Sequence, residues 1–314
     1  MKANKIFYAI VIISCALLAL PLSAQDDWPE DCQLLDLEEE MGAANDARAD
    51  GDVAAFVLSM SEINQFMDRA LGSCMINSVS EGVDLSGASL LGIILQGADL
   101  PEANLQGADL SFANLRGVGF SNANLQGANL SNANLQGANL VLANLQGADL
   151  SFASLQGVAI SNTNMQGADF SNANLQDAMA GMSNFEDAVL IRIDLQETKL
   201  WASDLQRVDL SYANLHDTEL WEANLEGANL ERANLDGTIL GWANLSGVNL
   251  THVVFTETTA LPDATCQWDH LERRLECDRY WTPDTDLARF TDPTHPGFWD
   301  PCVELEQTPW YCDE

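Results

Sequence analysis

A repeat of five residues dominates this chain. An apolar residue, usually leucine, occupies every fifth position from Leu85 to Phe255 without one insertion or deletion, which makes 35 successive repeats. A small residue, most often alanine, stands two positions earlier, as in the segment Ala123-Asn124-Leu125-Gln126-Gly127. A period of five fits neither an α-helix nor the alternation of a β-strand, so it predicts a solenoid whose sides are each five residues long.

The repeat unit A-(N/D)-L-x-x resembles the pentapeptide-repeat family over residues 83–256. The resemblance implies an all-β solenoid, a right-handed quadrilateral β-helix with four repeats per coil and therefore about nine coils. The leucine and the small residue before it point inward, because a large residue at the second site would overpack a narrow bore. The residue between them faces outward, and the other two form a corner that suits glycine. At about 4.8 Å per coil, the column is about 42 Å long.

A few repeats depart from the leucine rule. Most substitutes are other large apolar residues, but Ala180 leaves one centre small. Two nearby inner sites are enlarged instead, at Ile193 and Thr198. We therefore expect a local swelling or bend around Met179-Ala180-Gly181-Met182.

The N-terminal residues 1–24 are typical of a secretory signal. Lys2 and Lys5 precede an apolar run over residues 6–20, and small residues lead to a cleavage site after Ala24. We expect an exported protein, periplasmic or secreted, with no membrane span after cleavage. A lipoprotein cleavage box ending at Cys15 is the alternative, and an uncleaved anchor would want about 20 apolar residues.

The charge balance is strongly acidic, with a formal net charge of −34. Removing residues 1–24 takes away two lysines and no acids, so the mature chain would carry −36. Such a chain repels phosphate backbones and anionic lipid headgroups, which argues against direct binding to nucleic acid or to a membrane surface.

Six cysteines remain after signal removal, and all of them lie outside the repeats. An even number in an exported chain predicts three disulfides. Chain position favours three pairs, Cys32–Cys74, Cys266–Cys277 and Cys302–Cys312. Metal ligation is the rival interpretation, but the sequence contains no C-x-x-C pair.

Two flanking domains are expected to cover the ends of the solenoid. Residues 25–82 read as a helical hairpin, with apolar residues at three- and four-residue intervals on both arms. Residues 257–314 form a tail rich in Cys and Trp, with little periodicity. Open solenoid ends expose unpaired backbone, so such caps would prevent end-to-end association. A homodimer is possible as well.

The sequence shows no motif for catalysis, a cofactor or a metal. His216 is expected to face outward and His252 to lie at a corner on another side, so the two cannot share an ion. Neither a G-x-S-x-G elbow nor an H-E-x-x-H pair occurs. We therefore predict a protein that is not an enzyme and has no cofactor, with metal binding or enzymatic activity in the tail as an alternative.

Aromatic residues are the best candidates for contact with a partner. Trp201 and Trp221 are one coil apart, so their indoles should stack outward on one side, with Trp242 about one coil further on. Tyr212 marks another side, with Arg192 and Arg232 one coil below and above it. Exposed aromatic groups on a polar rod suggest a surface for a protein or a sugar ring. A tail that folds back over the tryptophans is the competing explanation.

These features predict an exported scaffold that presents a rigid acidic surface to a protein or glycan partner. The family resemblance also implies an alternative, because some members resemble duplex DNA in width and charge and protect DNA gyrase from inhibitors. Export argues against that role, and so does the abundance of Asn, Gln and Ser on the repeat faces.

Overall fold

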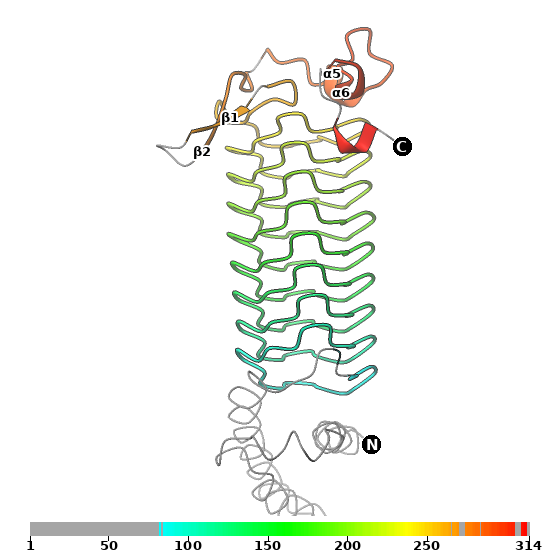
Figure 1. Cartoon of the computed structure of the whole chain (residues 1–314). Helices are drawn as coiled ribbons and strands as arrows, with labels where there is room; N and C mark the ends of the chain where they lie inside the picture. The colour runs from blue at the N-terminus through cyan, green and yellow to red at the C-terminus, as the bar shows by residue number, and fades with distance from the viewer. Residues whose placement is uncertain are drawn as a thin grey trace, which may run out of the picture.

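The structure is a four-sided column of stacked coils that ends in an irregular C-terminal cap (Figure 1). It is a computed structural model that describes residues 82, 84–264, 266–269, 274–282, 284–304 and 309–312. The expected signal sequence, the lipidation site at Cys15, the N-terminal helical hairpin and the cysteines Cys32 and Cys74 lie outside the described residues.

Backbone pairing confirms that one coil contains twenty residues. Every parallel bridge from Asp84↔Asn104 to Asn234↔Val254 joins residues twenty positions apart. The Leu125 N–H, for example, donates to the Asn144 carbonyl at 2.7 Å. Each side of the tube pairs through a single residue, so the column is a stack of short bridges without long strands.

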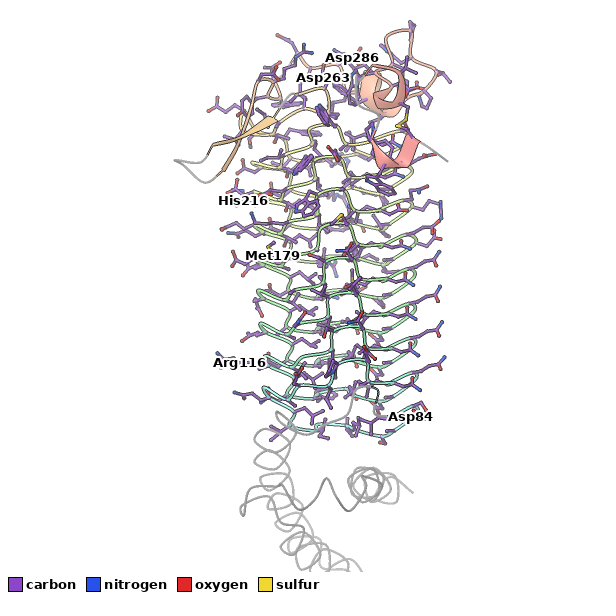
Figure 2. The ribbon with its side chains drawn as sticks, viewed as in Figure 1. Asp84, Arg116, Met179, His216, Asp263 and Asp286 are labelled. Carbon is purple, nitrogen blue, oxygen red and sulfur yellow. A yellow bond between two sulfur atoms is a disulfide. The ribbon has the colours of Figure 1, made fainter. Side chains whose placement is uncertain are left out.

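Four sides and four corners describe the surface of the column. Sides 1, 2, 3 and 4 are centred on Leu105, Leu110, Leu115 and Phe120 and on their equivalents at intervals of twenty residues. The two residues after each centre form a corner. Arg116 and His216 both belong to the corner between sides 3 and 4, and they mark the same edge of the column in Figure 2.

The bore is filled as the repeat predicts. Leu125 is 0% exposed and Ala123 is 1% exposed, and these values are typical of the centres and inner small sites. Because each buried leucine contributes on the order of 2 kcal/mol before the cost of ordering the chain, stability accumulates coil by coil.

The corners are tight turns in which the second of the two corner residues is left-handed. In a typical turn the Ala128 N–H donates to the Leu125 carbonyl at 3.0 Å. This second residue has a positive φ at every corner from Gly87 to His252, although glycine occupies only some of these positions. The outward Asn supports the turn, since the Asn124 side-chain oxygen accepts from the Gln126 N–H at 3.2 Å.

Stacked amides form a ladder on the corner between sides 1 and 2. Gln106 donates to Gln126 at 3.0 Å, Gln126 to Gln146 at 2.9 Å, and Gln146 to Gln166 at 2.9 Å. The row therefore stabilises neighbouring coils, as stacked amides can.

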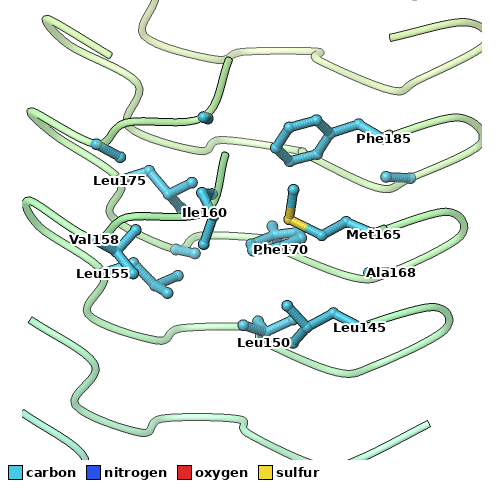
Figure 3. Close-up of a cluster of buried hydrophobic side chains, with 14 of the residues drawn as sticks. Leu145, Leu150, Leu155, Val158, Ile160, Met165, Ala168, Phe170, Leu175 and Phe185 are labelled. Carbon is cyan, nitrogen blue, oxygen red and sulfur yellow. The ribbon is translucent and has the colours of Figure 1, made fainter. Parts of the chain in front are cut away.

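Backbone pairing continues in register through residues 179–182, where the sequence predicts a local swelling or bend. Met179 bridges to Ala159 below it and to Lys199 above it, with the usual register. Ala180 is 0% exposed, and the rings of Phe170 and Phe185 lie 5.9 Å apart in the bore at this level (Figure 3). Two aromatic rings on neighbouring sides thus supply the volume that the small centre lacks.

Enlarged inner sites that carry a hydroxyl are also accommodated. Thr198 donates to the Leu175 carbonyl at 2.7 Å, and Ser203 donates to the Ala180 carbonyl at 2.9 Å. Both side chains are 0% exposed. Because each buried hydroxyl has a backbone partner, it can replace alanine without an unsatisfied polar group.

The solenoid stops where one extra residue enters the circuit. The last parallel bridge joins Ile239 to Ala260, a step of 21, and Ala260 then pairs antiparallel with Tyr280. The Gly247 N–H donates to the Thr291 carbonyl at 2.6 Å, so the tail takes over pairing above the last coil.

The cap is built from short elements. A two-stranded antiparallel sheet pairs β1 (Cys266–Asp269) with β2 (Arg274–Cys277), and α5 (Ala288–Thr291), α6 (Pro301–Glu304) and the 3-10 helix η2 (Trp310–Cys312) follow. Phe290 and Trp299 are buried and continue the core of the column.

Two of the expected cysteine pairs fall in the cap. Cys302 and Cys312 form a disulfide with their Cα atoms 5.4 Å apart. Cys277 is also disulfide-bonded, and the register of β1 and β2 places Cys266 opposite it. Among the helices that the structure describes, none has the length and apolar character needed to cross a membrane.

Candidate partner-binding surface

Trp201 and Trp221 stack on each other at the corner between sides 4 and 1. Their ring centroids lie 6.3 Å apart with an angle of 23° between the planes. Both residues are the first of their corner, one coil apart, and both are partly exposed. The expected outward stack is therefore present in the structure.

Gly181 makes room for this stack. A Cβ atom placed on Gly181 would lie 2.5 Å from Cε2 of Trp201, so the indole rests against the glycine backbone. One face of Trp201 covers Gly181 and the other faces Trp221. Both faces of Trp201 are therefore covered, so a sugar ring could stack on this indole only by displacing a neighbour.

The C-terminal segment covers the upper end of the same corner. The Tyr311 hydroxyl donates to the Trp242 carbonyl at 2.5 Å, and Nε1 of Trp310 donates to the Glu222 carbonyl at 3.1 Å. Trp242 is therefore less available to a partner than its place in the repeat suggests, because the tail docks there.

Two side chains at the docked tail, Glu222 and Tyr311, have raised pKa values. Burial raises the pKa of the Glu222 carboxyl. Burial, followed by the nearby charges of Glu222 and Asp300, raises the pKa of the Tyr311 phenol far above its usual range. The phenol is thus held neutral, as a hydrogen-bond donor to Trp242 must be.

Tyr212 lies on the corner between sides 2 and 3. The guanidinium carbons of Arg192 and Arg232 lie 5.5 and 5.4 Å from its ring centroid, so the ring is held between two cations. Arg232 also donates to the Tyr212 hydroxyl. This ladder is distant from the tryptophans, since corners 2–3 and 4–1 are diagonally opposite, and its contacts stabilise the rod without a partner.

Three further apolar side chains near Trp201 were not singled out by sequence reasoning. Leu142, Met179 and Met182 are 57%, 43% and 49% exposed. Leu142 and Met182 lie two coils apart on corner 4–1, and Met179 lies on side 4 beside them. The sequence does contain a signal for them, because Asn122 and Asn162 occupy the equivalent corner positions where polar residues are usual.

Charge is distributed unevenly along the column. Residues 84–176 contain six acidic residues and one arginine, whereas residues 177–256 contain thirteen acidic and four basic residues. Three carboxylates occupy successive coils on corner 3–4, at Asp177, Glu197 and Asp217, and all three are exposed. Side 4 therefore has an acidic edge on one flank and an apolar edge on the other.

Two carboxylates flank His216 on corner 3–4. Nε2 of His216 lies 3.2 Å from Asp217 and its Nδ1 lies 3.3 Å from Asp236. Hydrogen bonds from the Thr256 and Thr258 hydroxyls lower the pKa of Asp236. Among the described residues, no group of three or more His, Cys, Asp or Glu side chains could hold a metal ion.

The chain is similar to parts of several proteins of known structure. HetL from the cyanobacterium Nostoc sp., a protein involved in the regulation of heterocyst differentiation, is 29% identical over 59% of this chain and 92% of its own, with a TM-score of 0.41. Trypsin-treated QnrB1, a plasmid-mediated fluoroquinolone resistance protein, is 15% identical over 55% of this chain and 79% of its own, with a TM-score of 0.39.

Rfr23 from the cyanobacterium Cyanothece is 37% identical over 30% of this chain and 61% of its own, with a TM-score of 0.17. No curated protein sequence matches the chain. The family described as "Pentapeptide repeats" matches residues 81–117, 113–151, 153–190, 183–221 and 213–251, which is more than half of the chain. The chain therefore belongs to the pentapeptide-repeat family, whose members wind a right-handed quadrilateral β-helix.

Proposed function

We propose that this chain is an exported, non-enzymatic scaffold that binds a protein partner along side 4. The observation that carries the proposal is that the exposed Leu142, Met179 and Met182 and the partly exposed Trp201 lie on side 4 and its corner 4–1, with the acidic corner 3–4 on the other flank. Exposed apolar side chains on corner 2–3, such as Phe112 and Phe152, lie apart from this group. Apolar side chains that gather on a rigid surface mark a contact site for another protein. The stacked coils hold these side chains at fixed spacing, which lowers the ordering cost of binding.

Export rests on two sequence features. Residues 1–24 have the pattern of a cleaved signal, and the cysteines lie outside the repeats. The disulfide between Cys302 and Cys312 is consistent with an oxidising compartment. We also infer that about nine coils and an N-terminal helical hairpin complete the architecture.

The charge distribution supports a scaffold over a mimic of duplex DNA. DNA carries one charge per about 1.7 Å, so the length of residues 84–176, which is about 22 Å, would need about 13 phosphates. That stretch has six carboxylates and one arginine. Only the upper half of the column approaches the required density.

A photo-crosslinking experiment tests the proposal. The mature protein is prepared with a photo-reactive residue at Met182, or at Phe152 on the opposite corner as a control. We expect the crosslinker at Met182 to capture one exported protein that the crosslinker at Phe152 does not capture. That protein, once purified, should bind the scaffold again. The double variant Trp201→Ala/Trp221→Ala should lose that binding. Equal crosslinking from both positions would remove side 4 from the account.

A further inference from the structure

We infer that side 4 accepts a basic amphipathic helix of the partner, lying parallel to the column axis. The inference rests on the proposed function and names the chemistry of its partner. It follows from the two edges of side 4, from the spacing of the coils and from the contact of Trp310 with Glu222 at the upper end.

The two edges of side 4 differ in chemistry. Corner 4–1 presents Leu142, Met182 and the edge of Trp201, whereas corner 3–4 presents the exposed carboxylates of Asp177 and Glu197. A complementary partner needs an apolar row beside a cationic row. An amphipathic helix with Lys or Arg next to its apolar stripe provides both rows on one element.

The middle of side 4 does not oppose such a helix. Met179 is exposed there and adds apolar area. Lys199 is the basic residue on this strip, and its Nζ lies 3.0 Å from the Glu219 carboxylate, which balances its charge. Partner cations on the other flank would meet the carboxylates of corner 3–4.

The axial repeat of the column suits a helix better than a strand. Equivalent side chains recur about every 4.8 Å along the column, and a helix presents the same face every 5.4 Å. Over three coils the mismatch grows to about 2 Å, which flexible Met and Lys side chains can absorb. Residues on one face of a β-strand recur at about 6.6 Å, so a strand is already out of register with the coils by about 2 Å at its first step.

The tail sets the length of the site. The apolar group begins at the coil of Leu142, and Trp310 contacts Glu222 at the upper end. The free strip between them spans about four coils, or about 14 Å from the first to the last. A helix of about three turns fills that length.

The test measures binding of a synthetic helical peptide to the full exported chain. The probe has about three turns, with leucines on one stripe and lysines on the adjacent stripe, and carries a fluorescent label for anisotropy. One control peptide has the same composition with leucine and lysine dispersed around the helix, and a second has glutamate in place of lysine. We expect the amphipathic basic peptide to bind at least tenfold more tightly than either control.

Matched variants locate the site. Met182→Asn should weaken binding about tenfold, because it removes apolar contact, whereas Phe152→Asn on corner 2–3 should not. Both positions have a left-handed backbone, and asparagine already occupies the equivalent positions Asn162 and Asn132. Asp177→Asn/Glu197→Gln should weaken binding about threefold to tenfold at low salt and less at high salt, and Glu226→Gln on corner 1–2 should not. Thermal unfolding shows that each variant is folded.

Equal binding of the dispersed peptide, or equal effects of the Met182 and Phe152 variants, would overturn the inference. A partner that is captured through Trp201 and Trp221 while the basic helix fails to bind also overturns it, and in that case the proposed scaffold function stands.

Discussion

The indole of Trp201 lies against the backbone of Gly181, in the space that a Cβ atom would occupy. Glycine is present at this corner for its lack of a side chain, since it is the first residue of the turn and does not have the left-handed conformation. The contact joins Gly181 to the stacked pair of Trp201 and Trp221.

Gly181→Ala should therefore displace Trp201 and destabilise the column by about 1–3 kcal/mol, the usual cost of overpacking. Denaturant unfolding and tryptophan fluorescence measure the two effects. Ser161→Ala, at the same turn position one coil below, is the control and should change little. In the double variant Gly181→Ala/Trp201→Ala the added cost of the alanine should disappear. If that cost persists, the indole is not its cause.

Ala180→Leu should destabilise the column, although it restores the repeat. The rings of Phe170 and Phe185 already occupy the bore at this level, so a leucine overpacks it by about 1–3 kcal/mol. Adding Phe185→Leu should recover part of that loss. Urea unfolding of the single and double variants checks the order, and a more stable Ala180→Leu protein would show that space remains beside Ala180.

Phe152→Gly should stabilise the protein slightly, by up to about 1 kcal/mol. Phe152 has a φ of 58° and is 59% exposed, so it carries backbone strain with little packing in return. Ser151→Gly, at the preceding position with ordinary φ, should instead cost about 0.5–1 kcal/mol. The midpoint of urea unfolding distinguishes the two variants. Equal losses would mean that Phe152 packs more than its exposure suggests.

Docking of the tail should weaken at alkaline pH. The pKa of Tyr311 is raised in the folded state, so its contribution to docking is complete below its usual value of 10 and is lost as the pH rises through the higher folded value. Hydrogen exchange at Trp310, compared with an amide in the middle of the column, measures the docking. Tyr311→Phe should remove this alkaline dependence and weaken docking by about 1 kcal/mol at neutral pH, since the bond to Trp242 is lost.

The charge of Glu222 should weaken the same docking. Its pKa is raised by burial, so its contribution to docking is favourable below its usual value and is lost as the pH rises through the folded value. Glu222→Gln should therefore slow hydrogen exchange at Trp310 at pH 7 and remove the dependence on mildly acidic pH. Faster exchange in this variant would show that the charge of Glu222 supports the tail.

The expected cysteine pairing and signal cleavage can be tested together on the exported protein. We expect three disulfides in the exported protein, with Cys302–Cys312 among them, and a mature start at Gln25. Mass spectrometry of the non-reduced and reduced protein, with N-terminal sequencing, measures the cysteine state and the cleavage site together. A lipid-modified Cys15 or six free thiols would contradict the expected export and pairing.

The sequence predicted the bore because its rule is local and strict. Each side needs one large and one small inward residue. The position of Leu125 and Ala123 within the repeat therefore predicts that both side chains point into the bore. The same count placed Trp201 over Trp221, because equivalent positions in successive coils must stack. Periodicity predicts these features without knowledge of any distant contact.

Features that depend on distant contacts were not predictable in this way. The volume missing at Ala180 is supplied by rings on neighbouring sides, and no rule based on one repeat relates Phe170 to Phe185. The tail has no period, so its docking on Trp242 could be offered only as an alternative. The exposed group around Met179 depends on which outward positions the tail leaves uncovered, and the contacts of Trp310 and Tyr311 with the column follow no repeat.

Below Ala260 every circuit of the column contains twenty residues. Duplication of one complete circuit would therefore lengthen the rod by about 4.8 Å and leave every corner pointing in its former direction. Duplication of a single pentapeptide would instead turn the cap and the upper coils by a quarter of a revolution relative to the lower half. The distance between the two ends of the column can therefore change in evolution while each side keeps its direction.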